Sequence, residues 1–117
     1  MLIRRDGKMK LQKKLFEGKG EIEIEPLFMQ DEFSSSVRFC ARVTLPCGSS
    51  IGLHTHTDED ELYFILSGDG TVFDGGDSTE VSGGDSILTR SGESHSIENT
   101  GAEKLVLLAV IPQSHTQ

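Results

Sequence analysis

The stretch GSSIGLHTHTDEDELYFILSG, residues 48–68, decides the fold. Two short strand-like segments in it are joined by four polar residues, 57–60, and a connection of that length predicts a β-hairpin. In such a hairpin Glu61 lies opposite His56. His54 and His56 are two residues apart on their strand, so both imidazoles point to the same face as Glu61. The hairpin therefore predicts three ligands for one metal ion.

The sequence on either side of this stretch predicts further strands. Polar and apolar residues alternate in 21–25 and again in 37–45, which is the pattern of half-buried strands. Short apolar segments separated by Gly, Asp and Ser then follow at close spacing, as is typical of a β-sandwich or barrel. These segments are 70–74, 78–81, 86–88, 95–99 and 105–111. Only residues 8–16 suggest a short helix, so the fold class is predicted to be all-β, in a single domain.

The net charge of −8 is unevenly distributed along the chain. Residues 1–19 carry seven Lys or Arg and two acidic residues, a net charge of +5, which leaves −13 for the rest. An acidic body repels polyanions, so no nucleic-acid partner is expected. We interpret residues 1–20 as a basic N-terminal arm, 21–112 as the barrel and 113–117 as a C-terminal tail. The arm is expected to be a mobile, solvated end, or to lie on the acidic body of a second copy.

Location and assembly are predicted from what the chain lacks and from its strand edges. No apolar stretch approaches the about 20 residues of a membrane span, and no apolar block of signal-peptide length opens the sequence. A cytoplasmic protein without a membrane partner is therefore expected. Cys40 and Cys47 are then expected to be free thiols rather than metal ligands. A short barrel commonly covers exposed strand edges by pairing, so a homodimer is expected.

A fourth metal ligand is predicted outside the hairpin. His95 begins a later strand, and closure of a barrel would bring it to the other three ligands. Three imidazoles and one carboxylate suit a divalent transition metal and leave coordination positions open for water or substrate. We expect one ion per chain, Mn or Fe in the first place, with Ni, Co, Cu and Zn as alternatives. His115, in the tail, is interpreted as a surface side chain.

Two motifs in the sequence resemble those of the cupins. The first is matched by Gly48, His54, His56, Glu61 and Gly68, at the intervals of that family. The second is matched by Gly84, Gly92, His95 and Asn99, with Arg90 in place of a proline. Fifteen residues separate the two motifs, a short gap that is similar to that of small, single-domain bacterial members.

The resemblance implies a double-stranded β-helix, that is, a jelly-roll or cupin barrel, with His54, His56, Glu61 and His95 as the metal ligands. In general look the chain resembles oxalate decarboxylases, although Ile51 stands where those enzymes have a substrate-binding arginine. The implied function is that of a metal-dependent lyase, oxidoreductase or isomerase acting on a small anionic or oxygenated molecule that coordinates the metal. The alternative is a non-catalytic module that binds or senses a metal or a small molecule.

Further side chains are candidates for roles beside the metal. Tyr63, predicted to lie opposite His54 and to face inward, is the candidate acid or hydrogen-bond donor. Arg42 and Arg90 are the candidates for binding an anionic substrate, and Arg38 is a third arginine that could take this role. The intervening residues Leu62, Phe64 and Leu66 face the other way, and we expect them to pack under the sheet or against a partner subunit.

Overall fold

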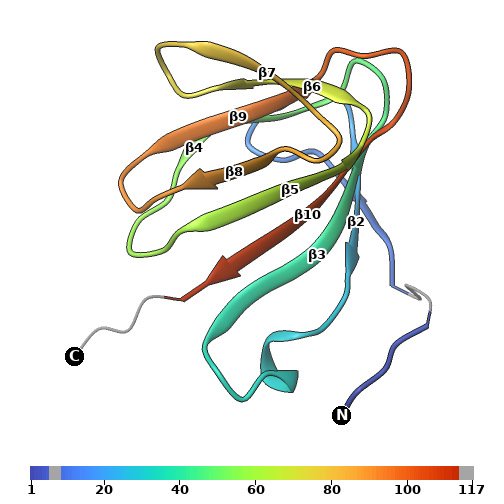
Figure 1. Cartoon of the computed structure of the whole chain (residues 1–117), viewed down its shortest axis with the longest axis vertical. Coiled ribbons are helices and arrows are strands. Elements are labelled where there is room, and N and C mark those ends of the chain that lie inside the picture. Colours follow the sequence, from blue (N-terminus) through green and yellow to red (C-terminus); the bar gives the residue numbers. More distant parts are fainter. Residues whose placement is uncertain (6–8, 114–117) are drawn as a thin grey trace.

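The structure is a computed structural model that describes residues 1–5 and 9–113, and it consists of two antiparallel sheets (Figure 1). The described strands are β1 (Leu11–Lys13), β2 (Ile22–Pro26), β3 (Val37–Leu45), β4 (Ser50–Thr55), β5 (Glu61–Ser67), β6 (Asp69–Phe73), β7 (Ser78–Ser82), β8 (Ser86–Thr89), β9 (Ser94–Asn99) and β10 (Leu105–Pro112). One sheet has the order β1-β2-β3-β10-β5-β8, and the other has the order β4-β9-β6-β7. The predicted all-β, jelly-roll architecture is confirmed.

The core lies between the two sheets and follows from the two-residue period of the strands. Along β10, for example, alternate residues are buried from Leu105 to Ile111. Large side chains from both sheets are fully buried there, including Ile22, Leu45, Ile65, Ile97, Leu105 and Leu107. On β5 the same alternation buries Glu61 and Tyr63 and leaves Leu62, Phe64 and Leu66 exposed on the outer face, as predicted.

The predicted hairpin between β4 and β5 is wrong. β4 pairs with β9 in one sheet, and β5 pairs with β10 and β8 in the other, so residues 56–60 cross from one sheet to the facing one. Asp58 in this crossing has a positive φ of 61°, and its N–H donates to Ser91 Oγ at 2.9 Å. A polar connection of this length fits a crossing between facing sheets as well as a hairpin, and the sequence pattern does not separate the two.

The suggested helix over residues 8–16 is also wrong in the part that the structure describes. Leu11–Lys13 form β1, which pairs antiparallel with β2, with Leu11 opposite Ile24. All three residues of β1 are exposed, so burial of their side chains does not hold this segment in place. The open edge of β2 supplies backbone partners instead.

The described part of the basic arm lies against the chain's own barrel. Arg4 pairs with Glu32 of the 3-10 helix η1 (Gln30–Glu32) at 2.7 Å, and Lys19 pairs with Glu98 of β9 at 3.3 Å. The Ser50 N–H donates to the Lys19 carbonyl at 2.9 Å. These contacts place positive charge from the arm on the acidic body of the same chain.

Three other predictions concern the C-terminal tail, the two cysteines and membrane-spanning segments. Of the predicted tail, Gln113 is paired, since its N–H donates to the Ser36 carbonyl at 3.0 Å, whereas His115 lies outside the described residues. Cys40 and Cys47 are free thiols. Within residues 1–5 and 9–113, no helix has the length and apolar character needed to cross a bilayer.

Candidate metal centre

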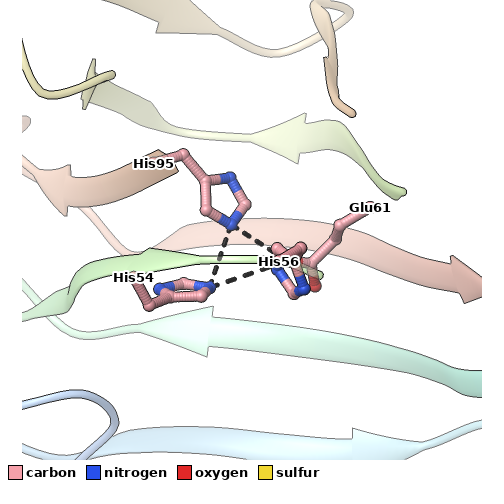
Figure 2. A group of neighbouring side chains, drawn as sticks. All are labelled: His54, His56, Glu61 and His95. Carbon is pink, nitrogen blue, oxygen red and sulfur yellow. Dashed lines mark hydrogen bonds and ion pairs between the residues drawn. The ribbon is translucent and has the colours of Figure 1, made fainter. Parts of the chain in front are cut away.

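Four side chains predicted from the sequence meet between the two sheets (Figure 2). His54 comes from β4, His95 from β9 and Glu61 from β5, while His56 follows β4 at the start of the crossing. One potential ligand atom from each residue lies within 4.8 Å of the others. His54 and His95 are direct neighbours across the two strands, and barrel closure therefore supplies the fourth ligand as expected.

The ligand atoms face one another, and three pairs of them are at hydrogen-bond distance. His56 Nε2 lies 2.8 Å from Glu61 Oε1, and His95 Nε2 lies 3.1 Å from the same oxygen. His54 Nε2 lies 3.0 Å from His95 Nε2 and 3.9 Å from Glu61 Oε1. Three imidazole nitrogens are thus gathered around one carboxylate oxygen.

The opposite nitrogens of the three rings are held by partners outside the cluster. His54 Nδ1 donates to the Gly52 carbonyl at 2.8 Å, and His56 Nδ1 donates to Glu59 Oε1 at 3.2 Å. A carbonyl and a carboxylate only accept, so in the neutral rings these Nδ1 atoms carry the hydrogen and Nε2 presents a lone pair. Such outer partners are the usual device that orients a metal-binding histidine.

The third ring has a more adaptable partner. His95 Nδ1 lies 2.8 Å from the hydroxyl of Thr89, which either donates or accepts. When the hydroxyl accepts, the His95 Nε2 lone pair is free for a ligand. When it donates, His95 Nε2 carries a hydrogen and bonds to His54. Thr89 therefore satisfies both tautomers of His95.

The arrangement fits a bound cation. With His56 neutral, its Nε2 lone pair faces Glu61 Oε1 at 2.8 Å, which sets two acceptors against each other unless a proton or a metal ion lies between them. Both side chains are buried, and a buried carboxylate needs a partner of opposite charge. Three imidazoles and a carboxylate are borderline donors that suit divalent transition metals.

The ionisation of Glu61 and of Tyr63 follows from the same surroundings. Burial alone would raise the pKa of Glu61, but the imidazoles of His54, His95 and His56 outweigh it and lower the pKa to about 2. Glu61 is therefore a carboxylate at neutral pH. Burial, together with the charge of Glu61, raises the pKa of Tyr63 well above its ordinary value, so its hydroxyl stays protonated. The Tyr63 ring is stacked on His95, with the ring centres 5.1 Å apart.

A cavity of about 190 Å³ adjoins the cluster on the side of His54, His56 and Glu61. Tyr63 belongs to its wall, together with the cationic side chains Lys13 and Arg38. The other wall residues are apolar: Leu15, Phe16, Ile24, Phe39, Val43, Ile51, Ala109 and Ile111. Three of the four potential ligands thus border a small space whose wall is otherwise mostly apolar.

A family model described as a cupin domain matches residues 41–111, which include all four potential ligands. The chain belongs to the cupin family. The match extends from β3 to β10, so it covers most of both sheets of this cupin.

Individual relatives agree with the family assignment. This cupin is 49% identical over 94 residues to an oxalate-binding protein of Thermotoga maritima. The aligned region covers 80% of this chain and 78% of that protein. A crystal structure of a predicted oxalate decarboxylase from the same organism matches with a TM-score of 0.91 at 42% identity, covering 97% of this chain and 99% of that one. A cupin barrel protein of Salinispora arenicola matches with a TM-score of 0.69 at 20% identity, covering 79% and 76% of the two chains, and shows the fold alone.

Two of the arginines proposed for substrate binding lie away from the cavity of this cupin. Arg42 pairs with Glu25 at 3.5 Å, and Arg90 pairs with Glu93 at 3.1 Å in an exposed turn. Neither belongs to the cavity wall, whereas Arg38 does. Arg38 is engaged by Glu59 through two hydrogen bonds of 2.7 Å, so its guanidinium is already paired.

Three residues at the site of this cupin were not predicted from the sequence. Glu59 supports His56, Thr89 supports His95, and the Phe16 ring is stacked on His54 with the ring centres 3.9 Å apart. Glu59 is three residues from His56 in a polar segment, which is a signal that a search for outer partners could use. Thr89 and Phe16 carry no such signal, because their positions depend on the pairing of β8 with β5 and on the path of the arm.

Proposed function

We propose that this cupin holds one divalent transition metal, Mn or Fe, through His54, His56, Glu61 and His95 and acts on a small carboxylate bound beside it. The observation that carries the proposal is the convergence of three imidazole Nε2 atoms on Glu61 Oε1 at the edge of a small cavity. A bound ion would supply Lewis-acid polarisation of a carboxylate or carbonyl group, or activation of O₂.

The chain's own residues would hold and orient the carboxylate. Tyr63 lies in the cavity wall with a protonated hydroxyl, which places a hydrogen-bond donor close to Glu61. Lys13, from the exposed strand β1, adds positive charge to the same wall. The apolar wall residues exclude water, which strengthens each polar contact made inside.

Oxalate is the first carboxylate to test. The support comes from the relative named an oxalate-binding protein and from the structural match to a predicted oxalate decarboxylase. Oxalate is also small enough for a space of about 190 Å³. The reaction class would then be that of a lyase or an oxidoreductase.

The second candidate function is metal-dependent binding without turnover. The name of the 49% identical relative describes binding alone, which favours this alternative. Turnover would also need a group that transfers a proton. In this chain the Glu59 carboxylate is already bonded to Arg38 and His56, so Tyr63 is the nearest candidate for this role.

The test begins with metal content and then separates binding from turnover. Protein purified without chelator, or reloaded with Mn²⁺ or Fe²⁺, is analysed for metal, titrated with oxalate by calorimetry, and assayed for formate, CO₂ and O₂ consumption. We expect about one ion per chain and metal-dependent turnover that His95→Ala abolishes and His115→Ala preserves. Binding of oxalate without turnover would establish the second candidate, and failure to take up any of these metals would overturn both.

A further inference from the structure

We infer that the cavity selects chelating carboxylates that carry a short apolar group, with a 2-oxo acid as the ligand class. This inference rests on the proposed function, because the chelating end of the ligand would bind at the metal centre. It adds a preference that comes from the rest of the cavity wall.

Much of the cavity wall apart from the potential ligands is apolar and buried. Ile24, Val43 and Ile51 are each at most 5% exposed, and they come from three different strands. Ala109 and Ile111 of β10 complete this wall from the centre of the six-stranded sheet. An apolar group placed against these side chains leaves water, which favours binding by about fourfold for each buried CH₂.

The wall offers little to a second carboxylate. A buried charge is costly unless it is paired and hydrogen-bonded. The guanidinium of Arg38 is held by both carboxylate oxygens of Glu59, and Lys13 belongs to an exposed strand. Ile51, 3% exposed, contributes only hydrocarbon at the depth of the ligands. The ligand's charged end is therefore best placed at the cluster and its apolar end against the wall.

Phe16 closes this space from the arm. Its ring is stacked on His54 at an interplanar angle of 9°, although 55% of the residue is exposed. Phe16 also has a positive φ of 54°, which a non-glycine residue adopts at a cost. The backbone around it is fixed, since the Gly52 N–H donates to the Leu15 carbonyl at 3.1 Å. Phe16 thus supplies an apolar side to the cavity and limits its length.

The size of the cavity sets the upper limit of the apolar group. Pockets for drug-sized ligands are about 300–1,000 Å³, whereas this one is about 190 Å³. A methyl or ethyl group is therefore a better match than a long or aromatic substituent.

The test uses a homologous series that keeps one chelating headgroup. Calorimetric titration of the Mn²⁺-loaded full chain with glyoxylate, pyruvate and 2-oxobutyrate should give an affinity that rises about fourfold with each added carbon. Each affinity is corrected for that of the same acid for free Mn²⁺, and oxalate is titrated in parallel as a reference. A flat or falling series, with oxalate still bound, would overturn the inference and leave the proposed function intact.

Two variants test whether the wall is the cause. Val43→Thr keeps the shape of the side chain and places a hydroxyl in the wall, and it should flatten the series without loss of Mn²⁺. Val110→Thr, on the same sheet but outside the cavity wall, is the matched control and should keep the rise. Phe16→Ala should also reduce the rise, and because the residue is largely exposed the variant should fold. If the affinity still rose by the full factor along the series in both Val43→Thr and Phe16→Ala, the inference would be overturned. If the Mn²⁺-loaded protein bound neither oxalate nor any of the 2-oxo acids, the proposed function would be overturned as well.

Discussion

His54 and His95 are paired directly across β4 and β9, and their Nε2 atoms lie 3.0 Å apart. The backbone holds the Cβ atoms of such cross-strand neighbours about 4.5–5.5 Å apart on one face of the sheet. His54 Nδ1 is committed to the Gly52 carbonyl, so the His54 Nε2 lone pair is directed at His95. The sheet therefore prepares two of the four potential ligands before any ion is bound.

Metal binding should stabilise the fold, because the cluster exists only in the folded chain. At a free Mn²⁺ concentration of about 100 times the Kd, the free energy of unfolding should rise by about 2.7 kcal/mol. Thermal unfolding with Mn²⁺ and with a chelator measures this difference. His95→Ala should remove it and His115→Ala should keep it, and an equal shift in both variants would place the metal elsewhere.

The hydroxyl of Thr89 should control metal affinity from outside the cluster. Thr89→Val keeps the shape of the side chain but leaves His95 Nδ1 without its partner at 2.8 Å. Loss of such a partner typically lowers metal affinity about 10- to 100-fold. Competition with a chromophoric chelator measures the affinity, and Thr79→Val, at an exposed position of β7, serves as the control. Unchanged affinity in Thr89→Val would show that the hydrogen bond does not orient the ring.

Metal affinity should fall as the solution is acidified. Glu61 does not cause this change, because the surrounding imidazoles hold its pKa at about 2 and it stays ionised down to about pH 5. The imidazoles must be neutral to coordinate, so protons compete with the ion for His54, His56 and His95. Calorimetric titrations between about pH 8 and about pH 5 should show a steep loss of affinity with proton release on binding. Affinity independent of pH would argue against histidine ligation.

Gly52 should tolerate no side chain. A Cβ at this position would lie 1.8 Å from the Phe16 carbonyl oxygen, which is backbone and cannot rotate away. Gly52→Ala should therefore lower the free energy of unfolding by about 2–4 kcal/mol and displace the arm from β4. Urea unfolding measures the loss. Gly76→Ala, where an added Cβ would make only an ordinary contact of 3.6 Å, should change stability little, and equal losses in both would refute the explanation.

The outer face of the six-stranded sheet should mediate assembly. Leu62, Phe64 and Leu66 of β5 are 37–46% exposed, and Leu88 of β8, opposite Leu62, is 58% exposed. An apolar surface formed by adjacent strands commonly marks an interface between proteins. We expect a homodimer through this face, which Phe64→Lys should convert to a monomer in analytical ultracentrifugation. Leu53→Lys, on the other sheet, should leave the dimer intact, and a wild-type monomer would contradict the prediction.

The sequence predicts this fold well because the two-residue period and the regular turns are local properties. The strand 37–45 is found with the bounds that its alternation indicated. The four potential ligands also follow from the sequence, although the hairpin used to argue for three of them is absent. His56 and Glu61 meet because their strands face each other in two layers, and the polar segment between them has the same length in either arrangement.

What the sequence does not predict depends on contacts between distant segments. Arg42 and Arg90 were candidates by charge alone, and each is paired with an acidic side chain. The pairing of β2 with β3 brings Glu25 beside Arg42, whereas Glu93 is only three residues from Arg90 in the same turn. Phe16 belongs to a basic arm that shows no strand pattern around it. Its contact with His54 depends on close backbone approach at Gly52, which composition does not encode.

The stacking of Phe16 on His54 also places metal binding and ligand selection on different segments of the chain, although most sites combine the two. The potential ligands come from β4, β9, β5 and the crossing after β4, whereas one side of the ligand space comes from a segment nearly forty residues earlier in the chain. Mutation of the segment around Phe16 can therefore change which molecules fit without removing any of the four potential ligands. For protein engineering, this cupin offers a short, surface-accessible stretch at which selectivity can be randomised while the four inner residues stay fixed.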